Sequence, residues 1–407
     1  APRASDAAIE EGRKFYDSIE CWKCHGTTGR GDGQSAPTQS DDEGYPIRPA
    51  DLTKPWRFNG GGTVEEIYRR LRTGVDGTPM PSFSDLIDSG YMTDEQLWNV
   101  AHFVRSLGPE RAPNVREVVR AARVETLPDA VDDPAWDDVD AFFVPLVGQV
   151  IERGRWFAPS VSDVWVQALH DGRELALRLV WNDPSHSPAP EWAEWRAHVE
   201  SVMEPKEAPP PQGPLPDAIA VQFPREPTVG MERPYFLMGN ARDPVYLWHW
   251  QSSPATVSER IGRGFARTEP LASTAAPLTG TATFDTGQWR LLLRRALVVS
   301  DSATAAEPRT AERLDFQTSQ AIPFALFAWD GDNGEADTRA AISTWYFIYL
   351  EEPTSPLVYA APIIAALLTA GLGLFTVRRA QRRSTRAGVR HTGGTPPEPA
   401  HAGASAE

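Results

Sequence analysis

The sequence predicts a multidomain protein in which an all-α domain is followed by a mainly antiparallel β-sandwich and then by one C-terminal transmembrane helix. Three features predict this: helical periodicity around a cysteine motif in residues 1–108, short aromatic-rich strand patterns in residues 141–353, and an uncharged apolar run at residues 357–377. Residues 109–140, which are rich in proline and charge, are predicted to link the two domains. Residues 378–407 are predicted to form a basic, disordered cytoplasmic tail.

The bulk composition fits a globular protein without a nucleic-acid partner. The chain has 407 residues, of which 41% are hydrophobic and 23% charged, so it is long enough for two cores. Its net charge of -15 is the opposite of the basic surface that phosphate binding needs. The acidic surface either attracts a basic redox partner or serves solubility alone. The start at Ala1, without a methionine or an apolar stretch, predicts a mature exported chain.

The run Cys21-Trp22-Lys23-Cys24-His25 is a C-x-x-C-H motif. At this spacing, two thiols can add across the vinyl groups of one haem while the adjacent histidine binds the iron. The alternatives are a thioredoxin-like redox pair and half of a zinc site. Both are disfavoured because Cys21 and Cys24 are the only cysteines of the chain, which also excludes an iron–sulfur cluster. The motif therefore predicts one covalent haem c, with His25 as a ligand of its iron.

The flanks of this motif resemble the class I cytochrome c family over about the first 108 residues. The matching features are a first helix with Gly12, Phe15 and Tyr16, a glycine-rich stretch at 26–33, the run 48–52 and the run 77–81. Glycines suit a backbone that turns tightly against a flat porphyrin. The resemblance implies that Met80 supplies the second iron ligand, and a His/Met pair raises the reduction potential of the haem. With both positions filled, such a haem transfers electrons and has no open site for a substrate.

Met92 is the competing sulfur ligand for this iron. It precedes Thr93, which forms a capping-box pattern with Gln96 at the start of a helix, so Met92 is predicted to be a hydrophobic staple or a surface residue. Apolar residues recur along that helix at a spacing of three to four, which predicts that one face packs across the first helix. His102 on the same helix is predicted to be a partly exposed polar residue.

The second domain is predicted from short strands. The runs 164–168 and 175–181 are joined by Asp171-Gly172, which is a hairpin signal. Further strand patterns occupy residues 218–223, 289–293, 322–329 and 343–350. Short strands with irregular spacing and many aromatic residues favour an antiparallel sandwich or barrel.

Seven short motifs in a fixed order resemble the haem-binding γ subunit of ethylbenzene dehydrogenase and its relatives. They occupy residues 133–136, 168–172, 181–184, 220–224, 236–239, 247–250 and 328–331. The resemblance implies a β-sandwich that holds a non-covalent haem b. It also implies partners, because such subunits serve molybdenum enzymes of the dimethyl sulfoxide reductase superfamily through an iron–sulfur subunit. These enzymes include ethylbenzene and dimethyl sulfide dehydrogenases and nitrate-handling complexes.

A buried haem b needs one or two neutral ligands in an apolar pocket. The resemblance implies Met238 as one ligand, and the alternative is a methionine of the core. Well-described members of the family use a lysine as the opposite ligand, but no lysine follows Lys206 in this chain. His249, in an aromatic strand, is the predicted substitute, against the alternative of a strand histidine that faces solvent. His170 is the weaker candidate because the tip of a hairpin is predicted to be exposed.

The run Leu357–Val377 carries no charge and has the length needed to cross the ~30 Å hydrocarbon core of a membrane. Pro362 and two glycines in this run are tolerated in a membrane helix, and the alternative is a buried core helix. Arginines follow immediately, at 378, 379, 382 and 383. The positive-inside rule places that end in the cytoplasm. We therefore expect a single-pass protein of the cell membrane with the bulk of the chain on the periplasmic side.

Together, these features predict a dihaem electron-transfer subunit that is not itself an enzyme. It would relay electrons between the iron–sulfur and molybdenum subunits of a partner oxidoreductase and a soluble or membrane-bound carrier of a respiratory chain. The alternative is a monohaem membrane-anchored cytochrome c whose sandwich is a haem-free docking module, which the missing lysine favours. A catalytic oxidoreductase has little support, since the sequence shows no nucleophile–base arrangement and no nucleotide-binding glycine motif.

Overall fold

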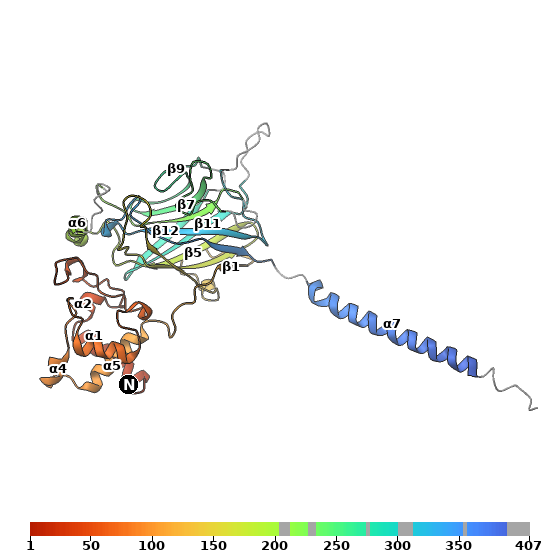
Figure 1. Cartoon of the computed structure of the whole chain (residues 1–407), viewed down its shortest axis with the longest axis horizontal. Coiled ribbons are helices and arrows are strands. Elements are labelled where there is room, and N and C mark those ends of the chain that lie inside the picture. The colour runs from red at the N-terminus through yellow and green to blue at the C-terminus, as the bar shows by residue number, and fades with distance from the viewer. Residues whose placement is uncertain (203–211, 227–232, 274–276, 300–311, 353–355, 389–407) are drawn as a thin grey trace, which may run out of the picture. The chain divides into compact units, whose positions relative to one another are not determined.

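The computed structural model describes residues 1–202, 212–226, 233–273, 277–299, 312–352 and 356–388 (Figure 1). The chain divides into two compact units, Ala1–Glu352 and Pro353–Glu407. The first unit contains a helical region, drawn in red and orange in Figure 1, and a large β-sheet, drawn from yellow to blue. The second unit contains one long helix.

The helical region contains α1 (Asp6–Ser18), α2 (Trp22–His25), α3 (Val64–Thr73), α4 (Ser84–Asp88) and α5 (Asp94–Ser106), with the 3-10 turns η1 (Ala36–Thr38) and η2 (Pro55–Arg57) between α2 and α3. Both α3 and α5 begin with a capping box. In α5 the hydroxyl of Thr93 accepts from the backbone N–H of Gln96, whose side chain in turn accepts from the backbone N–H of Thr93. The capping box predicted before the last helix of this region is therefore confirmed.

Helices α1 and α5 cross at close range, as the sequence predicts. A methyl group on Gly12 would lie 2.0 Å from the carbonyl oxygen of Asn99, so only glycine permits this approach. Tyr16 of α1 packs edge to face on Phe103 of α5, with ring centroids 5.2 Å apart. The apolar face of α5 forms the centre of the core around this crossing.

The sheet region contains the strands β1 (Val118–Arg123), β2 (Phe142–Pro145), β3 (Val147–Gly148), β4 (Asp163–His170), β5 (Glu174–Asn182), β6 (Ala218–Pro224), β7 (Val245–Ser252), β8 (Ala255–Gly262), β9 (Thr268–Pro270), β10 (Thr279–Asp285), β11 (Gln288–Ala296), β12 (Ala321–Trp329), β13 (Ala341–Ile342) and β14 (Tyr346–Leu350). Short helical segments between them are η3 (Pro134–Trp136), η4 (Pro190–Trp192), α6 (Ala193–Val202) and η5 (Gly331–Asn333). The hydrogen-bonded order is β10-β11-β5-β4-β1-β14-β12-β6-β7-β8-β9, with β2, β3 and β13 paired off this path. Each strand run predicted from the sequence overlaps one of these strands.

Strand β1 shows that the sheet begins earlier than predicted. The interval 109–140, predicted to be a linker, contains β1, which pairs in parallel with β14 and with β4 in the middle of the sheet. The same interval buries Trp136. The strand is short, and Val119 and Ala121 point into the protein while Arg120 between them is exposed. Its charge and its proline-bearing flanks therefore resemble those of a linker.

The sheet folds over itself into two layers around an apolar core. Alternate residues of β5 and β11 in one layer and of β6, β7 and β12 in the other contribute to one buried cluster. Trp250 of β7 contacts Trp181 of β5 and Trp289 of β11, with ring centroids 5.9 and 4.9 Å apart. Apart from the two pairings of β1, the strand pairs among the described residues are antiparallel. The predicted mainly antiparallel domain is therefore confirmed.

The outer face of the layer formed by β12, β6 and β7 carries a second apolar cluster. Its strand residues alternate with those of the core and include Ala218, Ala220, Val245, Leu247, Phe327 and Trp329. Leu237 and Met238, which lie between β6 and β7 in the chain, belong to the same cluster and are buried in it. We refer to this set as the Met238 cluster.

The second unit is formed by helix α7 (Pro356–Gly388). Its stretch Pro356–Arg383 is 28 residues long and contains an 18-residue segment with a mean hydropathy of 2.0 that is not buried, so its length and composition suffice to cross a membrane. The helix continues to Gly388, through residues that were predicted to be disordered, because arginine, glutamine and alanine are good helix formers. The rest of the predicted tail, 389–407, lies outside the described residues.

Candidate functional site

The C-x-x-C-H motif folds into the short helix α2. Cys21 directly precedes this helix, and Cys24 and His25 are its last two residues. Gly26 ends the helix with a φ of 79°, a left-handed value that glycine adopts without strain. The hydroxyl of Tyr16 donates to the carbonyl of Gly26 over 2.6 Å. The motif is therefore fixed against α1 at the point where the chain turns.

The ring of His25 is held in one orientation. Its Nδ1 lies 2.9 Å from the carbonyl oxygen of Ala50. An N–H donated to that carbonyl makes Nε2 the nitrogen that carries the lone pair, as in histidines that ligate metals. Burial lowers the pKa of His25, so the ring is neutral, as iron ligation requires.

Both thiols of the motif are free and half-buried. Burial raises the pKa of Cys21 to about 12 and raises the pKa of Cys24 as well. A reactive thiol of a redox pair needs a lowered pKa, so the surroundings disfavour the thioredoxin-like alternative. Among the described residues, neither cysteine belongs to a set of three metal-ligating side chains, so the zinc alternative lacks ligands. The thiols thus suit thioether bonds to a haem.

Of the two methionines in the helical region, Met80 is the one whose side chain is accessible enough to act as an iron ligand. Its half-buried side chain lies at the edge of the core, and its backbone N–H donates to the hydroxyl of Thr78 over 3.3 Å. Met92, by contrast, is 2% exposed and packs in the core together with Leu97, one turn into α5. This is the packing of a hydrophobic staple, and the alternative of a surface position for Met92 is wrong.

Two histidines are more buried than predicted: His102, which was expected to be partly exposed, and His170, which was expected to be exposed at a hairpin tip. His102 is 5% exposed, and its Nε2 lies 3.1 Å from the carbonyl of Pro2. His170 is 0% exposed, and its Nε2 lies 2.8 Å from the carbonyl of Glu351. The prediction failed for His170 because β1, which the sequence did not reveal, pairs alongside the end of β4. His170 lies in the layer opposite the Met238 cluster.

Met238 is fixed by its backbone as well as by packing. It is 3% exposed and has a φ of 56°, a left-handed value that is uncommon for residues other than glycine. Its N–H donates to Oε1 of Gln222 over 2.9 Å, and its carbonyl accepts from the N–H of Gly264 over 2.9 Å. A strained conformation persists only where its surroundings determine it, so the position of this thioether is strongly constrained.

His249 of β7 lies on the same face of the sheet as Met238. It alternates with the two tryptophans of its strand that point into the core, and its ring centroid is 6.2 Å from that of Trp329 in the Met238 cluster. Burial, with Arg260 nearby, lowers the pKa of His249 to about 4, so the imidazole is neutral. A thioether and a neutral imidazole on one apolar face are donors of the kind that haem b takes.

A buried polar atom on this face has no partner. Gln222 is 0% exposed, and no acceptor among the described residues reaches its Nε2. The same side chain accepts the N–H of Met238. The donor set and this unpaired N–H fit a bound cofactor that carries an acceptor group, such as a haem with its propionates.

Residues 48–54 connect the helical region to the sheet region. Lys54 Nζ lies 2.8 Å from Oδ2 of Asp163, and Arg48 Nη2 lies 2.9 Å from Oδ2 of Asp330. Both aspartates are buried, with exposed fractions of 1% and 0%. Ion pairs with buried carboxylates are costly to break, so this segment is anchored firmly to the sheet.

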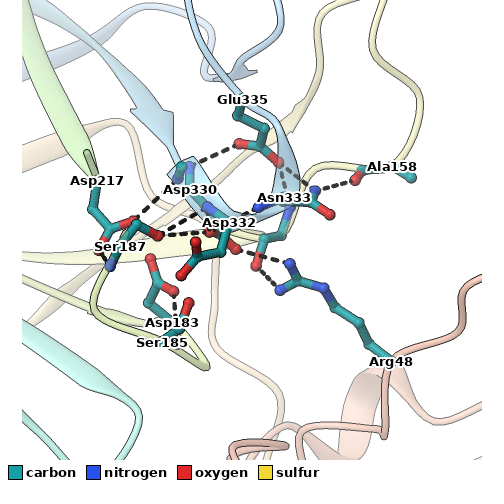
Figure 2. Close-up of polar contacts among 12 residues, drawn as sticks. Arg48, Ala158, Asp183, Ser185, Ser187, Asp217, Asp330, Asp332, Asn333 and Glu335 are labelled. Carbon is teal, nitrogen blue, oxygen red and sulfur yellow. Dashed lines mark hydrogen bonds and ion pairs between the residues drawn. The ribbon is translucent and has the colours of Figure 1, made fainter. Parts of the chain in front are cut away.

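Arg48 reaches a group of acidic side chains that sequence analysis did not identify (Figure 2). This acidic cluster consists of Asp183, Asp217, Asp330, Asp332 and Glu335, and all of them are buried. Burial, followed by repulsion between the carboxylates, raises the pKa of Asp183 well above its ordinary value and that of Asp217 to about 8. The available signal in the sequence was an acidic residue directly beside an end of each of the apolar strands β5, β6 and β12.

Two protein families match this chain. Residues 9–108 match cytochrome c, and residues 133–274 match ethylbenzene dehydrogenase. The fold and the first site thus define an electron-transfer haem protein. The chain carries a cytochrome c domain followed by a domain of the ethylbenzene dehydrogenase γ type.

Two curated relatives are similar over much of the chain. The protein named "Putative respiratory nitrate reductase heme subunit ORF7" from Haloferax mediterranei is 26% identical over 267 residues, which cover 65% of this chain and 84% of the relative. The chlorate reductase subunit gamma of Ideonella dechloratans is 25% identical over 177 residues, which cover 44% of this chain and 60% of the relative. Both names describe subunits of reductases.

Two solved structures match parts of this chain, but with low TM-scores. A chain of the reducing HAO-like protein complex of Kuenenia stuttgartiensis is 44% identical over 26% of this chain and 46% of its own length, with a TM-score of 0.24. A carbohydrate binding module of family 9 from Caldicellulosiruptor kristjanssonii is 10% identical over 59% of this chain and 98% of its own length, with a TM-score of 0.30. TM-scores of this size support no conclusion about function.

The substitution Arg48→Ala should destabilise the chain. It removes the cation beside the fully buried Asp330, and an unpaired buried carboxylate costs about 3 kcal/mol. Thermal unfolding should therefore show a lower Tm for this variant. The control Arg13→Ala removes only half-exposed ion pairs, with Glu10 and Asp17, and exposed pairs of this kind contribute little to stability. Equal Tm values for the two variants would contradict the role given to Arg48.

Proposed function

We propose that this chain is a dihaem γ-type subunit that transfers electrons between a partner molybdenum oxidoreductase and a carrier of a respiratory chain. The observation that carries the proposal is that one compact unit joins two candidate haem sites. One is the C-x-x-C-H motif, with its histidine ring fixed by Ala50. The other is the apolar sheet face with Met238 and His249.

In the cytochrome c domain, Cys21 and Cys24 would hold haem c through thioether bonds, and His25 and Met80 would bind its iron. A haem supplies one-electron redox chemistry. With His25 and Met80 both as ligands, the iron would keep no open position for a substrate. Apolar side chains at the edge of the core would cover the porphyrin, among them Phe58, Tyr68 and Phe83. These contacts support electron transfer, and not catalysis, as the role of this domain.

In the second domain, Met238 and His249 would bind haem b. Their neutral donors lie on one apolar face, and the unpaired amide of Gln222 supports a cofactor there. The resemblance implies a lysine as the second ligand, and His249 would take its place in this chain, where no lysine follows Lys206. Electrons would then pass within one chain between the two haems.

The relatives and helix α7 support the proposed partner and location. The curated relatives are named as a nitrate reductase haem subunit and a chlorate reductase γ subunit, which supports a reductase complex with molybdenum and iron–sulfur subunits as the partner. Helix α7 would anchor the chain in the cell membrane. Because Arg378, Arg379, Arg382 and Arg383 follow its apolar stretch, that end would face the cytoplasm and the haem domains would face the periplasm.

The substitution Met80→Ala should lower the reduction potential of haem c, because a thioether ligand favours the reduced iron. The haem itself should stay attached through Cys21 and Cys24. Potentiometric titration measures the first effect and the pyridine haemochrome spectrum the second. The control Met92→Leu alters the other methionine of this domain at similar volume and should leave the potential unchanged. A potential that falls in Met92→Leu and not in Met80→Ala would reverse the ligand assignment.

The pyridine haemochrome spectrum of the purified chain should show one haem c and one haem b. The substitution Met238→Leu keeps an apolar side chain of similar volume but removes the thioether, so it should abolish the haem b signal and leave haem c intact. Met92→Leu serves again as the control and should retain both haems. A wild-type chain that contains haem c alone would exclude the relay and support the haem-free docking module.

Purification of the chain from its native membrane should yield a complex that contains molybdenum and iron–sulfur clusters. Metal analysis of the purified complex measures molybdenum relative to haem c, and the expected ratio is one molybdenum per chain. The control is the same preparation from a strain in which only the predicted haem b ligands, Met238 and His249, are replaced. The rate of electron transfer is compared between the two preparations. Recovery of the chain with haem but without molybdenum would contradict the proposed partner.

A further inference from the structure

Three members of the acidic cluster share a small volume. Asp183, Asp217 and Asp330 each offer one carboxylate oxygen, and these oxygens lie within 4.8 Å of one another. The three side chains are 1%, 0% and 0% exposed. Two oxygens that bind one Ca²⁺ ion at about 2.3–2.6 Å can lie at most about 5 Å apart, so the three carboxylates are close enough to share an ion.

Asp183 has an oxygen without a partner. Its Oδ1 accepts from the backbone N–H of Ser185 over 3.2 Å, whereas no donor among the described residues reaches its Oδ2. Figure 2 shows the carboxylate of Asp183 directed toward those of Asp217 and Asp330. A buried carboxylate oxygen without a hydrogen bond destabilises the folded state, so a cation bound at this point would stabilise it.

The remaining acids of the cluster are already satisfied by hydrogen bonds. Oε1 of Glu335 accepts from Nε1 of Trp156 over 3.1 Å and from the backbone N–H of Ser160 over 2.8 Å. Oδ2 of Asp332 accepts from the backbone N–H of Ala189 over 3.0 Å. Asp217 accepts from the backbone N–H of Gly331, and Asp330 accepts from the backbone N–H of Asn333 and pairs with Arg48. Among the described residues of the cluster, the carboxylate oxygen without a partner is therefore Oδ2 of Asp183.

The three aspartates come from strand ends in both layers of the sheet. Asp183 follows β5, Asp217 precedes β6 and Asp330 follows β12. Strand β5 lies in one layer, while β6 and β12 pair with each other in the other layer. An ion bound by all three carboxylates would hold the two layers together at one end of the sandwich.

We propose that Asp183, Asp217 and Asp330 bind a structural Ca²⁺ ion. Hard divalent cations take oxygen ligands, and Ca²⁺ accepts six to eight of them in a flexible arrangement. The buried hydroxyl of Ser185 adds a further oxygen beside Asp183. Mg²⁺ is disfavoured because it keeps several waters in a strict octahedron, which a site this closed to solvent does not supply. The ion stabilises the second domain and takes no part in electron transfer.

The test is Ca²⁺ binding by the full-length, haem-loaded chain in detergent. After EDTA treatment and removal of the chelator, isothermal titration with CaCl₂ should show one site per chain, with a Kd at or below about 1 mM, as in extracellular calcium modules. The Tm of the EDTA-treated chain should rise when CaCl₂ is added, because a ligand that binds only the folded state stabilises it. The haem spectrum should not change. Titration with MgCl₂ should show binding at least roughly tenfold weaker.

The substitution Asp183→Asn should weaken Ca²⁺ binding roughly tenfold or more, because it removes one of the charged ligands. Asp163→Asn is the matched control, since Asp163 is equally buried but pairs with Lys54 outside this set of aspartates, and it should bind Ca²⁺ like the wild type. Absence of Ca²⁺ binding by the wild type up to about 10 mM would overturn the proposal, and so would unchanged binding by Asp183→Asn. The wild-type titration decides the question even if the variant does not fold.

Discussion

Residues 48–54 form the contact on which both domains depend. The carbonyl of Ala50 accepts the hydrogen bond that orients His25, and two residues earlier Arg48 pairs with the buried Asp330. On the other side of Ala50, Asp51 accepts from the amide of Asn182 over 2.7 Å. A displacement of this short segment would therefore move the iron-ligating ring and the contact between the domains together. The orientation of the first candidate haem ligand is thus coupled to the packing of the second domain.

The helical region could be predicted well because its signals are local. The C-x-x-C-H spacing, the capping box of Thr93 and Gln96 and the apolar period of α5 each extend over only a few residues, and the structure contains all of them. The hairpin between β4 and β5 was equally accessible, since Asp171-Gly172 lies between two alternating runs. Such patterns depend on neighbours in the sequence, so they can be interpreted without knowledge of distant contacts.

The features that were not predicted depend on residues that are far apart in the chain. Strand β1 owes its existence to β4 and β14, and without these partners its arginines and proline-bearing flanks are typical of a linker. The burial of His170 was missed for the same reason, since this hairpin tip is buried only because β1 pairs beside it. The acidic cluster is assembled from three separate strand ends, and each aspartate by itself is an ordinary loop residue. The unpaired amide of Gln222 indicates a cofactor site only because the same side chain bonds to Met238, and the sequence does not reveal this contact.

The position of β1 also sets an order of maturation. The apolar core of the cytochrome c domain and the hydrogen bond that orients His25 are formed within residues that precede β1, whereas the sheet requires β1 to pair with β14 near the end of the folded unit. Pairing between such distant segments is slow and has to await nearly the whole polypeptide. The first domain can therefore acquire its prosthetic group while the second is still an open set of strands. In this order, haem attachment precedes the contacts of residues 48–54 with the sheet.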